Sequence, residues 1–480
     1  MNYGQFLNMM PEAFLILELL VIFFADFALN KSELKLSKLW TITVAALVMQ
    51  TCLLFGTMEP TEAFGGIYVT SQMVNVMKII LTAGTLVVVI MSRTWLETNQ
   101  KISGEFFMLV LSTLLGMYMM MSSGSFLMFF LGLEMASVPM ACMVAFDKKR
   151  KNSAEGAAKY ILVATFSSGV MLFGISFIYA ATGSLYFDNV AAALSATASP
   201  LEIMGLVFFF SGLGFKISLV PFHFWTADTY QGAPTPVTGY LSVVSKGAAA
   251  LTLCIILTKV FGQMVDYWNP MLWIVIVLSI TVANLFAIRQ SELKRFMAFS
   301  SISQAGYIML AVLGGSQMGA TALTFYVLVY VVANMAVFTV ISVVEQNNGG
   351  RTDMNAYNGF YTTNPKLSFL MTLALFSLAG IPPFAGMFSK FFVFMAAVAG
   401  HEANPFWVYL VVFIALINTV VSLYYYLLIV KAMYIKKTTT PLPAFKSDVN
   451  TKLALALCTT GIALFGILSC LYDWIAAAAV

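Results

Sequence analysis

Residues 205–225 read GLVFFFSGLGFKISLVPFHFW, an apolar run that contains a lysine, a proline and a histidine. A bilayer core about 30 Å thick needs about 20 apolar residues in helical form, so this run is long enough to cross a membrane. Pro221 lacks a backbone donor and clashes with the turn before it, so we expect the helix to break just before this residue. Unwound backbone at membrane depth is tolerated only where it is buried in protein or faces water. The stretch therefore predicts an interrupted membrane helix that other helices enclose.

The composition of the whole chain is that of an integral membrane protein. Of its 480 residues, 60% are hydrophobic and 10% are charged, against about 45–50% and about 25% in ordinary globular proteins. The net charge of +4 is too small for the basic excess of a nucleic-acid binder. Five cysteines stand singly, and there is no C-x-x-C pair, Walker A loop or Gly-x-Gly-x-x-Gly motif. We therefore expect no metal, cluster or nucleotide cofactor in this chain.

Apolar segments of spanning length continue on both sides of the opening stretch. They predict an all-α protein of about fourteen transmembrane helices. The segments run over 11–29, 39–57, 73–92, 106–122, 125–146, 156–181, 202–231, 235–262, 270–289, 297–314, 319–345, 366–400, 405–434 and 452–476. Alternation with a period of two residues is absent, which excludes an outer-membrane barrel.

Basic residues are concentrated in every second connection. Nineteen of the 25 lysines and arginines lie after odd-numbered segments, as in the run Lys148, Lys149, Arg150 and Lys151. Connections after even-numbered segments, such as 121–124, contain none. The positive-inside rule then places the lysine-rich connections on the inner face of the membrane and both chain termini on the outer face.

Six basic residues fall inside the segments, where a lysine costs about 2.5–3.5 kcal/mol at the centre of a membrane helix. They are Lys78, Lys159, Lys216, Lys246, Lys259 and Lys390. Lys78 and Lys259 stand near segment ends, so we interpret them as side chains that snorkel to the membrane surface. Lys216, Lys246 and Lys390 lie deep in apolar runs or beside a helix break, which indicates a function. Lys159 begins a long segment and is a further candidate.

Glu134 and His223 are the other candidates for a function. Glu134 lies about 15 Å from the outer end of its segment, at 1.5 Å per residue. A buried carboxylate beside a buried lysine can exchange a proton with it, although a static ion pair between helices is the alternative. His223 adjoins the break at Pro221, and an ordinary histidine pKa of about 6.5 suits a proton shuttle. A buried histidine with satisfied hydrogen bonds is the alternative. We interpret Glu18 and Asp26 as structural or lipid-headgroup contacts.

A second break is expected at Pro382 and Pro383, seven residues before Lys390. Each break falls in the fourth helix of a five-helix block, and an odd block length inverts the second block in the membrane. This is the pattern of an inverted repeat with ion sites at interrupted helices, although prolines that only kink the helices are the alternative. The predicted units are three N-terminal helices (1–104), the first repeat (105–265), the inverted second repeat (266–437) and a last helix (438–480).

The motifs around the first break resemble a known family. The run KISLVPFHFWTAD at 216–228, followed by GAPTPV at 232–237 and Ser245-Lys246, resembles the signature of the antiporter-like subunits of respiratory complex I, which are similar to Mrp-type antiporters. The likeness also covers Glu134 and the break at 380–383. Among the L, M and N types, the segment count, the lysine at 390 and the run 159–169 favour the N type.

The resemblance implies roles for these residues. Glu134 and Lys216 look like the coupled acid–base pair of the family, Lys246 like its central lysine, and Lys390 like its terminal exit group. The chain would then be a proton-translocating subunit of an NADH-quinone oxidoreductase in a bacterial inner membrane. NADH, FMN, iron–sulfur clusters and quinone would be bound by partner subunits. The membrane partners would include antiporter-like subunit M and small membrane subunits.

Two other functions stay open at this point. A subunit of an Mrp-type cation/proton antiporter would share the fold. A structural membrane subunit that has lost pumping is less compatible with the sequence, because every ionisable position of the family pattern is present.

Overall fold

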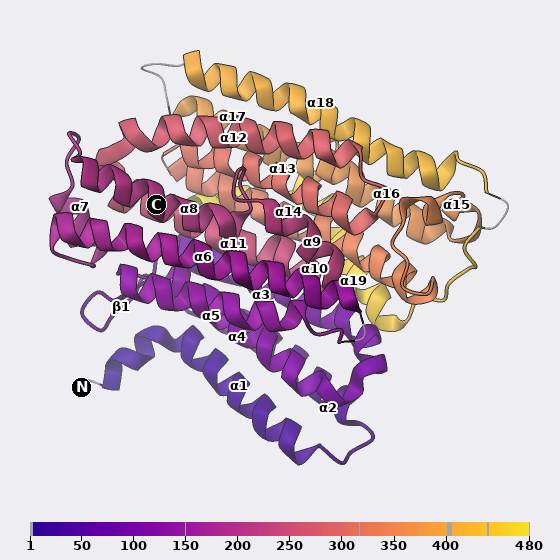
Figure 1. Ribbon diagram of the computed structural model, residues 1–480. Helices are drawn as coiled ribbons and strands as arrows, with labels where there is room; N and C mark the ends of the chain where they lie inside the picture. Colours follow the sequence, from indigo (N-terminus) through magenta and orange to yellow (C-terminus); the bar gives the residue numbers. More distant parts are fainter. Residues whose placement is uncertain (1–2, 149, 316, 401–405, 439–440, 480) are drawn as a thin grey trace.

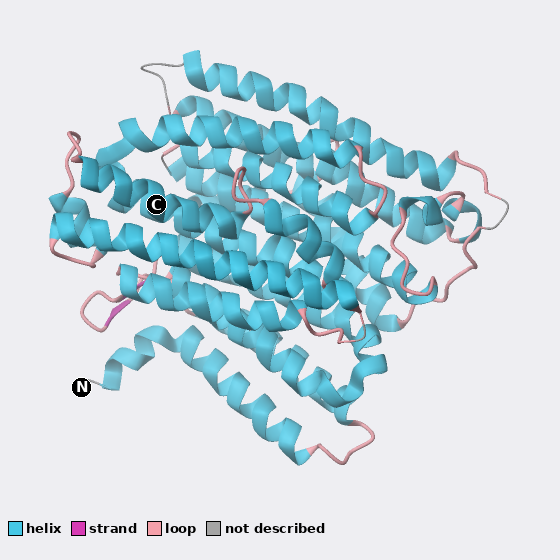
Figure 2. Cartoon of the chain, in the orientation of Figure 1, coloured by secondary structure: helices cyan, strands magenta, loops and turns pink. Residues whose placement is uncertain are grey.

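The computed structural model describes residues 3–148, 150–315, 317–400, 406–438 and 441–479. Long helices run side by side in a thick bundle, with short loops at its two ends (Figures 1 and 2). The helices are α1 (Met10–Ala28), α2 (Lys35–Gly56), α3 (Gln72–Leu96), α4 (Ser103–Met121), α5 (Phe126–Val144), α6 (Lys151–Thr182), α7 (Phe187–Ala193), α8 (Pro200–Ile217), α9 (Phe224–Gly232), α10 (Thr235–Tyr240), α11 (Lys246–Ile255), α12 (Val265–Ile288), α13 (Leu293–Leu313), α14 (Gln317–Asn347), α15 (Phe360–Thr363), α16 (Pro365–Ala379), α17 (Ala385–Ala399), α18 (Phe406–Tyr434), α19 (Val449–Ile467) and α20 (Ser469–Ala478).

Short elements complete the description. The 3-10 helices are η1 (Tyr3–Met9), η2 (Glu97–Ile102), η5 (Gly262–Met264) and η6 (Met354–Tyr357), and the π-helical turns are η3 (Leu241–Ser245) and η4 (Ile256–Val260). The strands β1 (Glu62–Ala63) and β2 (Tyr68–Val69) form an antiparallel pair.

Twelve stretches of helix in the described part of the chain are long and apolar enough to cross a membrane. One of them, Gln72–Met121, joins α3 and α4, and the shorter apolar helices α16 and α17 together cover the predicted segment 366–400. Each predicted segment therefore coincides with helix, and an all-α membrane fold is confirmed. The predicted segment 452–476 is not one continuous helix, because the helix is interrupted at Leu468 between α19 and α20. The count of fourteen crossings stays a prediction.

Even-numbered and odd-numbered connections lie at opposite ends of the bundle. Isolated bridges join Tyr68 to Ser123 and Ser125 to Tyr186, so three even-numbered connections meet at one end. Figure 1 shows the N-terminus, β1 and α7 at this end, and α15 at the opposite end. A bridge from Glu292 to Asp353 joins two lysine-rich, odd-numbered connections. Lys149, in the basic run after α5, lies outside the described residues.

Both proline-containing stretches are non-helical. After α8, Ser218 adopts a left-handed conformation with φ 67°, and the helix resumes only at Phe224. After α16, Gly380 has φ 88°, which a glycine adopts without strain, and α17 begins at Ala385. A third irregularity was not expected from the sequence: the π-helical turn η3 directly precedes Lys246. Such turns inside helices are frequent at functional sites.

Small residues let α4 and α5 approach each other closely. A Cβ atom added at Gly132 of α5 would lie 2.5 Å from the backbone nitrogen of Met120, and one at Gly116 of α4 would lie 2.5 Å from that of Ala136. Close backbone contact through glycine is a common way for membrane helices to pack. At the start of α5, the Ser125 side chain accepts a hydrogen bond from the backbone of Met128 and caps the helix. These contacts determine where the polar residues of α5 lie.

Candidate functional site

Lys216 is a buried cation in the last turn of α8. Its side chain is almost wholly enclosed, with 3% exposed. The ammonium Nζ donates to Ser137 Oγ of α5 at 2.8 Å and to Tyr160 Oη of α6 at 3.3 Å. Three helices and the adjoining break therefore enclose one ammonium and two hydroxyls. Hydroxyls both donate and accept, so this group of atoms can pass a proton.

Glu134 does not contact Lys216 directly. No ion pair within 4.0 Å joins the two side chains, both of which the structure describes. Ser137, one helical turn further along α5, lies beside the ammonium, while Glu134 is half-buried. Glu134 remains within electrostatic range of Lys216 and Tyr160. The side chains of Glu134 and Lys216 are thus within electrostatic range without a direct bond, and their role as a coupled pair stays a prediction.

Aromatic rings continue the site across the first break. Trp225 Nε1 donates to the carbonyl of Phe215 at 3.1 Å, and the same carbonyl also accepts from the backbone N–H of Ser218 at 2.9 Å. The Trp225 ring lies 5.0 Å from Tyr160 and 6.3 Å from Tyr230. Tyr230 of α9 therefore connects the surroundings of Lys216 with those of the next lysine.

His223 lies at the start of α9, beside the break. Its ring is 7% exposed and stacks on Phe224 at 4.6 Å. The buried Nδ1 atom has no hydrogen-bond partner among the described residues. His223 lies within electrostatic range of Lys246. The ring also interacts with the backbone of Pro221, so the proton shuttle stays a prediction.

Lys246 follows the π-helical turn and is 1% exposed. Its Nζ donates to Ser301 Oγ of α13 at 2.7 Å and lies 5.6 Å from the centre of the Tyr230 ring. Ser301 Oγ also donates to Tyr230 Oη at 3.3 Å. Lys246 and Ser301 therefore both lie beside Tyr230, whose ring is 6.3 Å from the Trp225 ring at the first break.

Lys390 of α17 is the third of the deep lysines predicted from the sequence. Its ammonium lies at the second break. Its Nζ donates to the carbonyl of Ala379, at the end of α16, at 3.0 Å, and it lies 4.9 Å from the centre of the Tyr307 ring. The adjacent carbonyl of Leu378 accepts from Gln304 Nε2 of α13 at 3.1 Å. Carbonyls of the last two residues of α16 therefore bind side chains of α17 and α13 at the second break.

Helix α13 supplies a polar face that sequence reasoning missed. Ser301, Gln304 and Tyr307 recur every third residue, and they contact the surroundings of Lys246, the second break and Lys390. The signal was present as the run SSISQAGY at 300–307 inside an apolar segment. Residues three apart on a helix lie on one side, so this spacing could have indicated a polar row.

Lys159 has a different environment from the buried lysines. Its side chain is 44% exposed and pairs with Asp228 at 2.6 Å and with Glu155 at 2.7 Å. Asp228 also pairs with Arg295. Lys159 therefore belongs to a partly solvated network at the lysine-rich end, next in sequence to Tyr160.

Another charged cluster at this end was missed. Glu345 of α14 pairs with Arg150 at 2.6 Å, accepts a hydrogen bond from Thr235 and lies 3.8 Å from Lys294. Lys294, assigned to a connection by its sequence position, is in the first turn of α13 and only 1% exposed. Its Nζ donates to the carbonyl of Ala233 at 2.7 Å. Burial of this lysine depends on α14, which lies far away in the sequence.

The interpretation of Lys78 as a snorkelling residue is wrong. Lys78 is 0% exposed and forms a 2.6 Å ion pair with Glu12 of α1. Glu18 is 4% exposed, so it is not a lipid-headgroup contact, whereas Asp26 pairs with Lys35 at 2.8 Å. Lys259 is exposed in the π-helical turn η4 that follows α11, and its interpretation as a snorkelling residue stays a prediction.

Comparisons with known proteins now identify the family. The sequence model of the family described as NADH:quinone oxidoreductase/Mrp antiporter, TM, matches residues 123–418. The chain belongs to this family. The matched range contains Glu134, the buried lysines Lys216, Lys246 and Lys390, and both helix breaks.

Individual family members resemble the chain over nearly its whole length. NADH-quinone oxidoreductase subunit N of Phocaeicola vulgatus is 54% identical over 477 residues, which are 98% of each chain. The protein of the same name from Nitrosomonas europaea is 34% identical and covers 93% of this chain and 92% of its own.

Solved structures agree with the family assignment. A chain of respiratory complex I from Thermus thermophilus superimposes with a TM-score of 0.80 at 30% identity, covering 96% of this chain and 98% of that one. A chain of the Mrp complex from a Dietzia species has a TM-score of 0.86 at 18% identity, over 98% of this chain and 97% of that one. The latter likeness shows the shared fold. Both solved chains come from membrane complexes.

Proposed function

We propose that this chain is the N-type, proton-translocating membrane subunit of an NADH-quinone oxidoreductase. The observation that carries the proposal is the row of three buried lysines, each beside a helix irregularity and each bound to a hydroxyl or a freed carbonyl. Buried cations without a carboxylate partner are costly in a membrane helix and mark ion or proton pathways. Interrupted helices near the membrane centre are a recurrent place for such sites.

Protons pass along the row from residue to residue. Lys216 exchanges a proton through Tyr160 and Ser137, and Lys246 does so through Ser301 and Tyr230. His223, with its available ring nitrogen, is a shuttle between these two groups, and Lys390 is the exit group at the second break. Lys159 is a further candidate where the row approaches the lysine-rich end.

Electrostatics couples the steps. The three lysines lie on α8, α11 and α17, so a proton gained or lost by one changes the field at the next. In a low-dielectric interior such a change acts over longer distances than in water. Glu134, which is within electrostatic range of Lys216 but not bonded to it, tunes the charge of the first lysine as their separation changes.

The proposal extends to the surroundings of the chain. NADH, FMN, iron–sulfur clusters and quinone belong to partner subunits, and the chain itself adds proton movement to their redox reaction. Its neighbours are subunit M and small membrane subunits in a bacterial inner membrane. Both termini face the periplasm, and residues 105–265 and 266–437 are inverted repeats between the units 1–104 and 438–480.

Replacement of Lys216 by methionine in the assembled complex tests the function. We expect Lys216→Met to lower quinone-coupled proton translocation strongly and to leave NADH oxidation by an artificial acceptor unchanged, because the redox groups lie elsewhere. Glu134→Gln should act in the same direction. Lys259→Met is the matched control, since this lysine is exposed. Unchanged numbers of protons per electron in Lys216→Met and Glu134→Gln would contradict the proposal.

Copurification addresses the alternative function. If the chain were a subunit of an Mrp-type cation/proton antiporter, it would purify without flavin- and cluster-binding subunits. We expect those subunits to copurify with it.

A further inference from the structure

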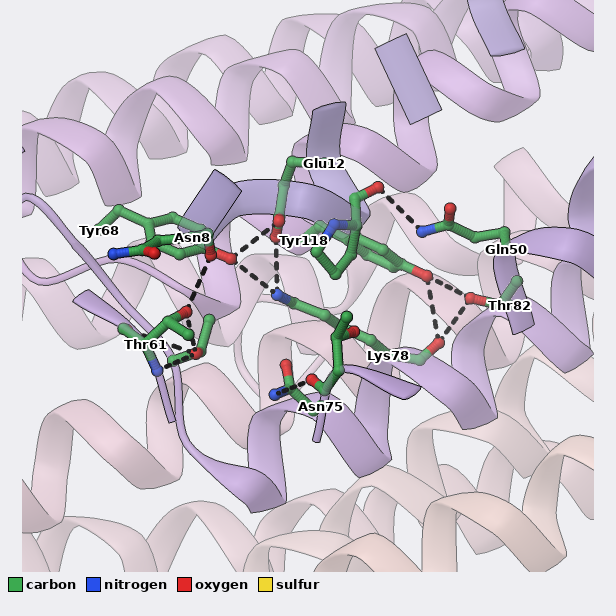
Figure 3. Close-up of polar contacts among 12 residues, drawn as sticks. Asn8, Glu12, Gln50, Thr61, Tyr68, Asn75, Lys78, Thr82 and Tyr118 are labelled. Carbon is green, nitrogen blue, oxygen red and sulfur yellow. Dashed lines mark hydrogen bonds and ion pairs between the residues drawn. The ribbon is translucent and has the colours of Figure 1, made fainter. Parts of the chain in front are cut away.

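The three N-terminal helices enclose a second acid–base cluster, which the row of buried lysines does not include. Figure 3 shows Glu12 of α1, Tyr68 of β2 and Lys78 of α3 pointing toward one another. Lys78 Nζ lies 2.6 Å from Glu12 Oε1, and Tyr68 Oη donates to Glu12 Oε2 at 2.8 Å. Lys78 Nζ also lies 3.4 Å from Tyr68 Oη. Glu12 and Lys78 are 0% exposed, and Tyr68 is 1% exposed.

Stability alone gives little reason for such a pair. Desolvation of two charges offsets much or all of their attraction, and apolar residues of similar volume are often as stable or more stable. The cluster also lies outside residues 123–418, the range that matches the family. Its chemistry resembles that of the first relay lysine nevertheless, since each site combines a lysine, a carboxylate in range and a tyrosine.

A cavity reaches the cluster from the end of the bundle that carries β1 and β2. It has a volume of about 340 Å³, and Asn8, Pro11, Glu59, Thr61, Tyr68 and Asn75 are among the residues that line it. In Figure 3, Asn8 and Thr61 lie on the same side of the ion pair as Tyr68. Tyr68 is thus the residue that both lines the cavity and bonds to Glu12. A cavity of this size and polarity accommodates several water molecules.

Further polar groups lie on the other side of the ion pair. The Lys78 ammonium is 5.3 Å from the centre of the Tyr118 ring of α4, and the Tyr118 hydroxyl bonds to Thr82. Glu18 stands six residues after Glu12 on the buried face of α1, about 9 Å further along the helix. It is 4% exposed, and neither carboxylate oxygen has a hydrogen-bond partner among the described residues. Tyr118 lies within electrostatic range of both glutamates.

We propose that Glu12, Lys78 and Tyr68 form a second proton-exchange site, which opens to the cavity at Tyr68. A hydronium ion in the cavity water gives a proton to the Tyr68 hydroxyl oxygen and is left as a water molecule, while Tyr68 gives its own proton to Glu12 Oε2. The result is one added proton, a neutral Glu12 carboxyl and an unchanged tyrosine. Glu18 is a second acceptor for that proton. Its carboxylate is buried without a partner among the described residues, and protonation removes the free-energy cost of burying that charge.

The charged and titratable groups around the site are few. Among the described residues they are Glu12 and Glu18 on α1, Glu59 at the cavity, Glu62 on β1 beside β2, Tyr68 on β2, Lys78 on α3 and Tyr118 on α4, while α2 contributes the neutral Gln50. The alternative is that the ion pair only fastens α1 to α3. The two interpretations differ in whether the charges must change during turnover.

The experiment uses variants of the complete complex reconstituted in vesicles. Lys78→Arg keeps the positive charge but cannot release a proton, and the double variant Glu12→Gln with Lys78→Met keeps the packing without charge. Tyr68→Phe keeps the ion pair and removes the bond to Glu12. The matched control is Asp26→Asn with Lys35→Met, which removes the other ion pair of α1. Proton translocation is measured per assembled complex, together with the pH-dependent infrared carboxyl signal.

We expect Tyr68→Phe to slow proton translocation about 2- to 10-fold, the factor that one hydrogen bond represents. Lys78→Arg and the double variant should lose more, and Glu12→Gln should remove one carboxyl signal that the control variant retains. Normal translocation in Tyr68→Phe together with an unchanged carboxyl signal in Glu12→Gln would overturn the proposal. These residues are absent from the relay tested by Lys216→Met, so the two results are independent. If Lys78→Arg or the double variant does not assemble, Tyr68→Phe and the infrared signal decide.

Discussion

Replacement of Gly132 by alanine should separate two helices and thereby disturb the site around Lys216. The new Cβ atom would lie 2.5 Å from Met120 N and 2.9 Å from Gly116 O, both backbone atoms of α4. Backbone atoms cannot rotate away, so α4 and α5 must move apart until this contact reaches at least 3.4 Å, an ordinary packing distance. Overpacking of this kind costs about 1–3 kcal/mol.

A matched variant isolates that cost. Alanine is favoured over glycine inside a helix by about 0.8–1.0 kcal/mol, and this gain is common to every such replacement. At Gly169 of α6 a Cβ atom would meet nothing within 4 Å. Gly169→Ala should therefore show only the stabilisation from helix propensity. The free energies of unfolding of the two variants should differ by the packing cost of about 1–3 kcal/mol.

The stability assay uses two buried thiols. Cys254 and Cys458 are buried in the folded chain, so a thiol-reactive fluorogenic dye reports their exposure on heating, once the exposed cysteines have been replaced. We expect Gly132→Ala to unfold at a lower temperature than Gly169→Ala. Equal or higher stability of Gly132→Ala would refute the reasoning about helix contact.

The same variant should weaken the relay. Ser137 lies five residues after Gly132 on α5 and accepts from Lys216 at 2.8 Å, so a displacement of the size required at Gly132 breaks this bond. A hydrogen bond to a charged group is worth about 1.5–3 kcal/mol, and its loss should lower proton translocation by about tenfold or more. Normal translocation in a destabilised Gly132→Ala variant would show that Ser137 is dispensable.

Two further predictions concern the second break and the topology. Lys390→Arg keeps a charge that can bind the Ala379 carbonyl but cannot give up its proton, so we expect poor pumping by a fully assembled complex; near-normal proton uptake in vesicles would mean that this lysine stays charged and only holds water. In a chain without its exposed native cysteines, Ser195→Cys should react with an impermeant thiol reagent from the outer side and Lys148→Cys only from the inner side, because the two residues lie in exposed connections after even- and odd-numbered segments. Labelling of Lys148→Cys from outside would overturn the helix count.

Much of the fold follows from local physical chemistry. A helix must be apolar to cross a bilayer, and a proline removes a backbone donor wherever it stands, so the segments and the non-helical stretches at Pro221, Pro382 and Pro383 are readable from the chain. The three deep lysines are conspicuous for the same reason, since a charge in an apolar run is costly in any arrangement of helices. The break at Leu468 lacks such a residue and was not foreseen.

Contacts between distant segments are a different matter. Sequence position near a segment end made Lys78 look like a surface residue, but α1 covers it and supplies Glu12, 66 residues away. Lys294 was placed in a connection, but α14 brings Glu345 to it. In both cases the lysine is buried because another helix covers it, and its own position in the sequence does not reveal this.

The sequence by itself determined the class of protein, the positions of the two proline-containing stretches and the deep lysines Lys216, Lys246 and Lys390, because these depend on the cost of each residue in a bilayer. The tertiary structure alone decided what each cation contacts. Ser137 and not Glu134 faces Lys216, Ser301 binds Lys246, and the Ala379 carbonyl binds Lys390. The reason is geometric: helix rotation and the close approach of backbones at glycine decide which face of a helix meets which neighbour, and both depend on the packing of the whole bundle.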